Sequence, residues 1–251
     1  MSGHSKWSSI KHKKGVADAR RGQLFSKLSR AIIVAARDGG PDPDANIALA
    51  NAIEKAREAS MPKENIERAI QRGTGGSGDG QAYEQITYEG YAPGGVALFV
   101  EALTDNRNRT ASEIRHLFAK HDGSLGASGA VAWLFERRGV VLVDAETVDE
   151  DELVLAAAEG GADDVEREGS SFRVTCAQEA LPSVRAALET AGVAYESAEA
   201  TMLPKTAVSI EDETTAKKVL RLVDALEESD DVQAVYANFD VPERVLEAVA
   251  T

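Results

Sequence analysis

An alternation of strand and helix patterns in residues 139–200 is the feature that most constrains the fold. The segment shows, in order, a strand, a helix, a hairpin around Gly169, a helix and a strand. This βαββαβ order is typical of a ferredoxin-like unit, in which two helices cover one face of an antiparallel sheet. The predicted elements are Val140–Val143, Asp149–Glu159, Asp163–Arg167, Phe172–Cys176, Gln178–Ala191 and Ala194–Ala198.

The segments on either side of this unit predict a second one. Residues 96–136 and residues 205–239 each show a strand, a helix and a strand. The economical arrangement is a second βαββαβ unit with the first inserted at a loop in its middle, where insertions are tolerated. Strands are expected at Val96–Thr104, Val131–Phe135 and Lys205–Ile210.

The first 75 residues have helical periodicity instead. Apolar residues recur at spacings of three and four in three stretches, which predicts a three-helix domain with helices near 18–39, 45–59 and 62–73. A glycine-rich linker follows, so the chain is of the α+β class. The predicted domains are 1–75 with a basic arm, 81–137 together with 203–251, and 138–202 as the inserted ferredoxin-like domain.

Positive charge is concentrated at one end of an acidic protein. The formal net charge is −14, yet residues 1–37 contain nine lysines and arginines against one aspartate. Residues 1–75 hold 14 basic and 8 acidic residues, or +6, and residues 76–251 hold 14 basic and 34 acidic residues, or −20. Such asymmetry indicates that one end binds a polyanion.

The candidate nucleic-acid contacts lie in the arm and on one face of the first helix. Cations beside an indole suit phosphate neutralisation and stacking on an exposed base. The alternative is a solvated tail that improves solubility. The candidates are Lys6, Trp7, Lys11, Lys13, Lys14, Arg20, Arg21, Lys27 and Arg30.

A second candidate is the segment 105–110, which precedes a helix expected from about Thr110. Two cations at a helix N-terminus are unfavourable unless an anion docks there. In the alternative, Asn108 or Thr110 caps the helix and the arginines are solvated or paired with Glu113. Spacing alone leaves both interpretations open, and the candidate residues are Asn106, Arg107 and Arg109.

Catalytic and metal-binding patterns are missing from the sequence. There is no Walker A motif, no Gly-x-Ser-x-Gly elbow and no metal-ligand spacing. The single cysteine, Cys176, is expected to be a small core residue. No apolar run could cross a bilayer, and the N-terminus lacks the apolar core of a secretory signal. We therefore expect a soluble cytoplasmic protein that is not an enzyme and binds no cofactor, metal or membrane.

Several motifs together resemble the YebC/PmpR family over nearly the whole chain. They are Ser2–Trp7, Lys11–Lys14, Phe25–Leu28, Ala35–Gly40, Met61–Pro62, Tyr88–Tyr91, Thr104–Thr110 and Val131–Phe135. The mitochondrial translational activator of cytochrome oxidase subunit one is a relative of this family. The resemblance implies a three-domain protein without catalytic activity. The nucleic-acid surface that it implies includes Lys6, Trp7, Lys11, Lys13, Lys14, Arg107 and Arg109.

The resemblance also implies two kinds of function. Members are commonly described as probable transcriptional regulators that bind DNA, and others as ribosome-associated factors that help translation through consecutive prolines. We interpret the chain as a non-enzymatic regulator of gene expression whose partner is DNA or ribosomal RNA, on the ribosome in the latter case. The −20 body favours RNA because it would repel a long duplex, whereas the family description favours DNA. A protein-interaction adaptor is a third hypothesis, and a monomer and a homodimer are both open.

Overall fold

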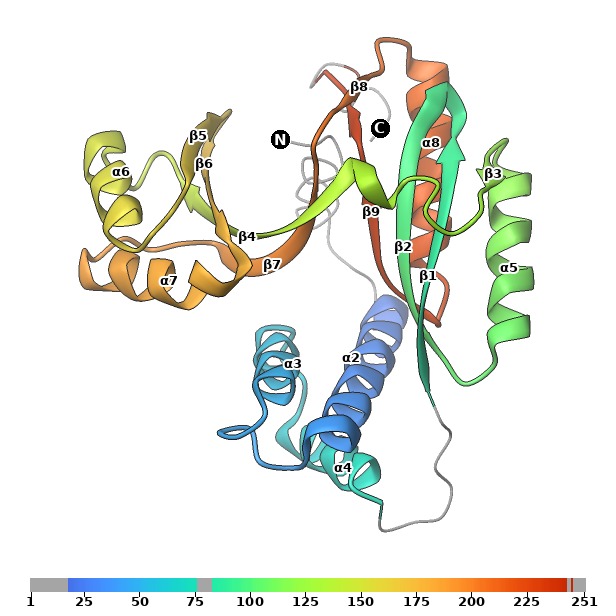
Figure 1. Cartoon of the computed structure of the whole chain (residues 1–251), viewed down its shortest axis with the longest axis horizontal. Helices are drawn as coiled ribbons and strands as arrows, with labels where there is room; N and C mark the ends of the chain where they lie inside the picture. The colour runs from blue at the N-terminus through green and yellow to red at the C-terminus, as the bar shows by residue number, and fades with distance from the viewer. Residues whose placement is uncertain (1–17, 76–82, 243–244, 246–251) are drawn as a thin grey trace.

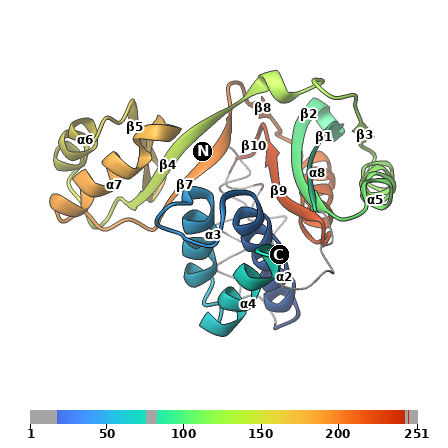
Figure 2. The same ribbon diagram turned by 60° about the horizontal axis from the view of Figure 1, so that its bottom comes forward.

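The chain forms three lobes in the computed structural model, which describes residues 18–75, 83–242 and 245. Helices α2 to α4 form one lobe, at the bottom of Figure 1. A four-stranded sheet with α5 and α8 forms the second, and another four-stranded sheet with α6 and α7 forms the third. Figure 2 shows the helical lobe between the other two. The α+β class expected from the sequence is confirmed.

The helical lobe contains the three predicted helices, α2 (Asp18–Gly39), α3 (Ile47–Glu58) and α4 (Lys63–Gly73). Ile32 and Leu49 are fully buried in its core. Helix α3 begins where the side chain of Asn46 accepts a hydrogen bond from the backbone N–H of Leu49, which is ordinary N-capping. Helix α4 ends at Gly73, which lies close to the backbone of α2. A Cβ added to Gly73 would be 2.4 Å from the backbone oxygen of Ile33. The missing side chain therefore lets α4 pack closely on α2.

The predicted ferredoxin-like unit is present, with an order of strands β5-β6-β4-β7 in which all neighbours are antiparallel. Leu153, Phe172 and Leu188 belong to the core between its sheet and its two helices. Cys176 is buried there as expected, and burial raises the pKa of its thiol. The elements are β4 (Phe135–Asp144), α6 (Glu150–Glu159), β5 (Asp164–Glu168), β6 (Ser171–Ala177), α7 (Leu181–Thr190) and β7 (Ser197–Pro204).

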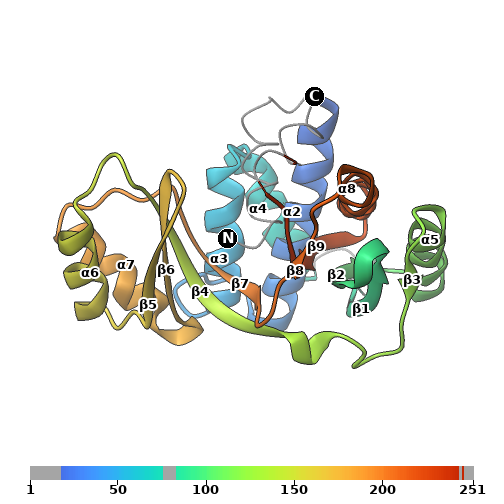
Figure 3. The ribbon, with the colours of Figure 1, turned by 90° about the horizontal axis from the view of Figure 1, so that it is seen from above.

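Strands β4 and β7 are longer than expected because they pair with each other from Phe135 opposite Pro204 to Leu142 opposite Ser197. Figure 3 shows the two strands leaving their lobe and running toward the other sheet. The division into residues 1–75, 81–137 with 203–251, and 138–202 remains a prediction. Two of its boundaries fall inside these strands.

The other sheet differs from the predicted second unit. Its strand order is β3-β1-β2-β9, so β1 occupies the position that β6 has in the inserted unit. The expected strand Lys205–Ile210 contributes only two residues, which pair in parallel with β10 outside this sheet. Strand β1 takes the position because it joins β2 through a tight turn, and a short loop costs little entropy to close. The elements are β1 (Glu84–Ala92), β2 (Val96–Thr104), α5 (Arg107–Lys120), β3 (Ser124–Leu125), β8 (Val208–Ser209), α8 (Glu213–Glu227), β9 (Val232–Ala237) and β10 (Phe239–Asp240).

The expected strand Val131–Phe135 is also wrong, since Ala132–Leu134 forms a 3-10 turn. Glu89 supplies the reason: it is only 4% exposed, and its carboxylate accepts three backbone hydrogen bonds of 2.6–2.7 Å from this segment. Burial opposes ionisation of Glu89, but the three bonds outweigh it and hold the pKa below its usual value. Amide groups that a strand would use in a ladder are therefore taken by one carboxylate. The donors are Gly129, Val131 and Ala132.

Candidate nucleic-acid interface

The predicted cationic face of α2 packs against the end of α8 and the loop that leads to β9. Lys27 Nζ donates a hydrogen bond of 2.5 Å to the backbone oxygen of Glu227, the last residue of α8. Arg30 donates to the backbone oxygen of Asp230 and forms an ion pair of 3.2 Å with Asp231. The last carbonyl groups of a helix have no partner within it and carry partial negative charge, so cations stabilise this end. These two candidates therefore make intramolecular contacts.

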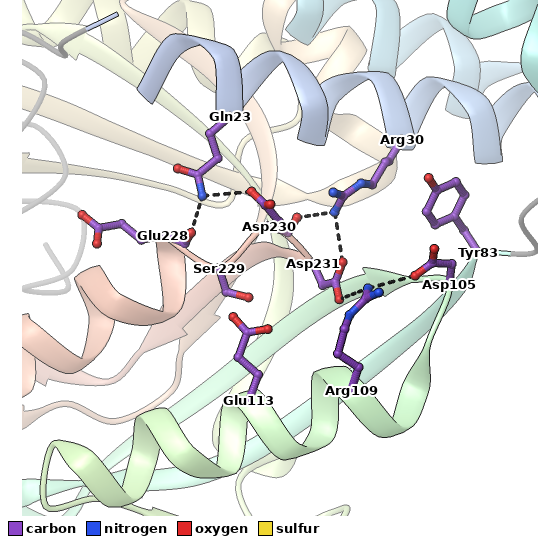
Figure 4. A pocket seen from close by; sticks show the side chains of 10 residues that line it. All are labelled: Gln23, Arg30, Tyr83, Asp105, Arg109, Glu113, Glu228, Ser229, Asp230 and Asp231. Atoms are coloured by element: carbon purple, nitrogen blue, oxygen red, sulfur yellow. Dashed lines mark hydrogen bonds and ion pairs between the residues drawn. The ribbon is translucent and has the colours of Figure 1, made fainter. Parts of the chain in front are cut away.

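Asp231 holds this junction together. It is 4% exposed, and its Oδ2 accepts hydrogen bonds from Arg109 Nη2 at 2.7 Å, Thr110 Oγ1 at 2.7 Å and Thr104 Oγ1 at 3.1 Å. Figure 4 shows Arg30 and Arg109 reaching it from opposite sides. Burial opposes ionisation of Asp231, but the bonds from Arg109, Thr110 and Thr104 outweigh it and lower the pKa. One carboxylate thus joins α2, β2 and α5.

Helix α5 begins earlier than the sequence predicts, at Arg107. The side chain of Asn106 caps it by accepting a hydrogen bond of 3.1 Å from the backbone N–H of Arg109. The expectation that Asn108 or Thr110 is the cap is therefore wrong. Both candidate arginines of this segment lie in the first helical turn and not in a loop before it.

Positive side chains at the N-terminus of α5 are unfavourable, and carboxylates of the same chain compensate the charge of one of them. Arg109 pairs with Asp231 at 2.7 Å and with Asp105 at 2.8 Å. The hydrogen bond to Asp231, followed by that to Asp105, raises the pKa of Arg109 against the cost of burial. Arg107 is exposed and forms no ion pair with the described residues. The anion expected at this helix end is thus provided by the protein's own carboxylates.

A hollow of about 480 Å³ opens between α2, α5 and the loop from α8 to β9 (Figure 4). Arg30 and Arg109 are the two cations in its lining. They face an excess of carboxylates, so this side of α2 repels phosphate. The carboxylates are those of Asp105, Glu113, Glu228, Asp230 and Asp231.

A neighbouring side of α2 borders a groove of about 380 Å³ that it shares with α4. Arg68 and Arg72 line the groove from α4, and Tyr83 lines it from the start of β1. The Arg21 guanidinium lies 5.4 Å from the centre of the Phe25 ring, which is part of the α2 wall. Among the described residues that line the groove, none is an aspartate or a glutamate. The groove is therefore the cationic counterpart of the acidic hollow.

Comparison with known proteins assigns the chain to a family. Residues 5–76 match the TACO1/YebC protein N-terminal domain, and residues 83–239 match the TACO1/YebC second and third domain. The chain belongs to the TACO1/YebC family. A "Probable transcriptional regulatory protein" of Rubrobacter xylanophilus is 62% identical to this TACO1/YebC chain over 250 residues and covers 100% of both. A protein of the same name from Syntrophobacter fumaroxidans is 54% identical, again over 100% of both chains.

A solved structure is also similar to this TACO1/YebC protein. The crystal structure of a conserved hypothetical protein, Aq1575, from Aquifex aeolicus has a TM-score of 0.79 at 54% identity, covering 90% of this chain and 93% of that one. Both relatives are named as probable transcriptional regulatory proteins, a name that describes regulation and not catalysis. The resemblance seen in the sequence motifs is confirmed.

Several predicted contacts of this TACO1/YebC protein remain untested by its structure. The arm and the side chain of Arg20 lie outside the described residues, so the roles of Lys6, Trp7, Lys11, Lys13 and Lys14 stay predictions. Within the described ranges, no cluster of His, Cys, Asp and Glu could hold a metal ion. The helices described there are too short or too polar to cross a bilayer.

Sequence reasoning missed the two arginines of α4. Asn65, Arg68 and Arg72 follow one another at spacings of three and four, which places them on one ridge of the helix. Like charges at positions i and i+4 repel each other, so Arg68 and Arg72 are a signal that this TACO1/YebC sequence contains. The helix was interpreted only through its apolar stripe.

Proposed function

We propose that this protein is a regulator of gene expression that binds nucleic acid through its N-terminal arm and helical lobe. The opposite charges of residues 1–75, at +6, and residues 76–251, at −20, carry this proposal. Lysines and arginines that neutralise phosphates gain affinity by releasing counterions, while the acidic remainder keeps a polyanion at one end. The names of the relatives support DNA as the partner and transcription as the regulated process. Such a regulator would act in the cytoplasm.

RNA, including ribosomal RNA on the ribosome, is the second candidate partner, and the packing of the helical lobe favours it. Proteins that read a duplex in the major groove commonly do so with a helix that has an exposed, basic face. The cationic face of α2 is occupied by the α8–β9 loop. Helix α3 is tied to the inserted unit by the ion pairs Glu54–Arg185 at 2.9 Å and Lys55–Glu199 at 3.0 Å. Helix α4 keeps Arg68 and Arg72 exposed, but both line the groove that it shares with α2. A flexible or single-stranded partner can enter such a groove without a helix that reads the major groove.

The test is equilibrium binding of the full-length protein to duplex DNA, to single-stranded RNA of the same sequence and to ribosomes over a range of salt concentrations. The variant Lys11→Ala/Lys13→Ala/Lys14→Ala removes three cations of the arm. The matched control, Lys205→Ala/Lys217→Ala/Lys218→Ala, removes three lysines from the acidic body. We expect the arm variant to reduce the salt slope of log K by about 2 to 3 and the control to leave it unchanged.

The outcomes separate the candidate functions. Sequence-selective duplex binding at physiological salt supports the DNA form and contradicts the ribosomal one. Co-sedimentation with ribosomes that is lost in the arm variant supports the RNA form. If the wild-type protein binds none of the three, the proposed function is wrong and the protein-interaction adaptor becomes the better explanation.

A further inference from the structure

We propose that the groove between α2 and α4 is a binding site for a single-stranded nucleic-acid segment, with phosphates held by Arg68 and Arg72 and a base stacked beside Tyr83. This inference rests on the proposed function and assigns it to a defined site in the helical lobe. The site is formed by residues of α2 and α4 and by Tyr83, and not by the arm.

The first step is the charge of the groove. Arg68 and Arg72 are exposed, stand one helical turn apart, and form no ion pair with the described residues. Like charges one helical turn apart destabilise a helix. Arg109, at the start of α5, is by contrast paired with Asp105 and Asp231. Because no acidic residue occurs in the described part of the lining, an external anion is the complement of this pair.

The second step is the chemistry of the walls. Tyr83 and Phe25 line the groove, and the Arg21 guanidinium lies over the Phe25 ring at 5.4 Å from its centre. Bases stack on aromatic rings and on guanidinium planes. Asn65 and Ser29 add an amide and a hydroxyl, which can bond to base edges or sugars. A simple anion such as inorganic phosphate would make no use of these walls.

The size of the groove limits which ligands it can hold. Packed helices lie about 8–10 Å apart, and the groove between these two holds about 380 Å³. That volume is at the small end of the 300–1,000 Å³ typical of ligand pockets, so it can take a nucleotide unit but not a duplex. Arg30 and Tyr83 line both this groove and the acidic hollow beside it. The carboxylates beyond them therefore limit how far a strand can extend on that side.

The experiment measures binding of the full-length protein to a labelled single-stranded RNA of about 12 nucleotides, with the duplex of the same sequence and inorganic polyphosphate as the other ligands. The groove variant is Arg68→Ala/Arg72→Ala. Its matched control is Arg57→Ala/Lys63→Ala, which removes two exposed cations of the same lobe that do not line the groove. A third variant, Tyr83→Leu, removes the aromatic ring and keeps the charge. Thermal unfolding of each variant verifies that it is folded.

We expect the groove variant to bind the single strand at least about tenfold more weakly and to lower the salt slope by about 1.4, while the control changes affinity less than about threefold. Tyr83→Leu should weaken the single strand at least about fivefold and leave polyphosphate binding unchanged. Equal losses in the groove variant and its control would overturn the site. So would a Tyr83→Leu variant that binds RNA as the wild type does.

The arm variant distinguishes this inference from the proposed function. If neutralising the arm abolishes binding while the groove variant binds as the wild type does, the groove is not the site and the proposed function stands. If the wild-type protein binds neither single strand nor duplex, the proposed function and the groove fail together.

Discussion

Two neighbouring sides of helix α2 carry the same kinds of residue and have opposite chemical surroundings. On one side, Lys27 and Arg30 meet the carbonyls and carboxylates between Glu227 and Asp231. On the other side, Arg21 borders a groove whose lining, over the residues that the structure describes, contains no carboxylate. A cation on a helix wheel is available to a ligand only if nothing of opposite charge packs across from it. Counting the cations of α2 therefore overestimates the surface that this helix can offer to nucleic acid.

Asp231→Ala tests the closed side of α2 and has the largest expected effect. It leaves Arg30 and Arg109 without their shared carboxylate and removes the acceptor of the buried Thr104 hydroxyl, which should reduce the free energy of unfolding by about 3 kcal/mol. Urea denaturation at pH 7 measures it. Asp230→Ala is the control, because Asp230 is exposed, and it should cost less than about 0.5 kcal/mol. Equal costs would refute the role assigned to Asp231.

The pH dependence of stability tests the same side. The pKa of Asp231 is lowered in the folded state, so its contribution is complete above its unfolded pKa of about 3.9 and is lost as the pH falls through the folded value. The difference in unfolding free energy between the wild type and Asp231→Asn should therefore shrink below about pH 4. Glu89 has a lowered pKa as well, so Glu89→Gln should remove a second part of the acid sensitivity. A difference that does not change with pH would contradict this assignment.

Lys27→Ala and Arg21→Ala form a matched pair on one helix with the same change of charge. Lys27 contacts Glu227, so its loss should reduce stability by about 1 kcal/mol and leave nucleic-acid affinity unchanged. Arg21 borders the groove, so its loss should weaken binding of a single strand about threefold with little change in stability. Denaturation and binding titrations on both variants decide this. The comparison fails if both variants lose affinity to the same extent.

Glu54→Gln examines a third side of the helical lobe and has the smallest expected effect. Glu54 forms a bidentate pair with Arg185, which lowers the pKa of Glu54. Because the pair is partly exposed, its loss should cost about 0.5 kcal/mol and leave nucleic-acid affinity as it is. A double-mutant cycle with Arg185→Ala measures the coupling. A large loss of RNA affinity would mean that the contact between α3 and the inserted unit also shapes the binding surface.

The fold was predictable wherever the contacts that define an element are local. The inserted βαββαβ unit and the three N-terminal helices follow from apolar periodicity and glycine positions alone. The second unit was predicted with the wrong strands, because Glu89 takes the amides of Gly129, Val131 and Ala132 from across the sheet. No pattern within residues 131–135 could indicate that these amides bind the carboxylate of Glu89, which is distant in the sequence.

The sequence by itself determined the charge segregation, the helical periodicity and the family motifs, since these depend on residue identity and short spacing. Only the tertiary structure decided which cations are neutralised. Asp231 lies far from Arg30 and Arg109 along the chain and contacts both, while Arg68 and Arg72 line a groove to which the described residues contribute no carboxylate. Ion pairing depends on distances of a few ångströms in space, and for pairs distant in sequence those distances exist only once the chain has folded.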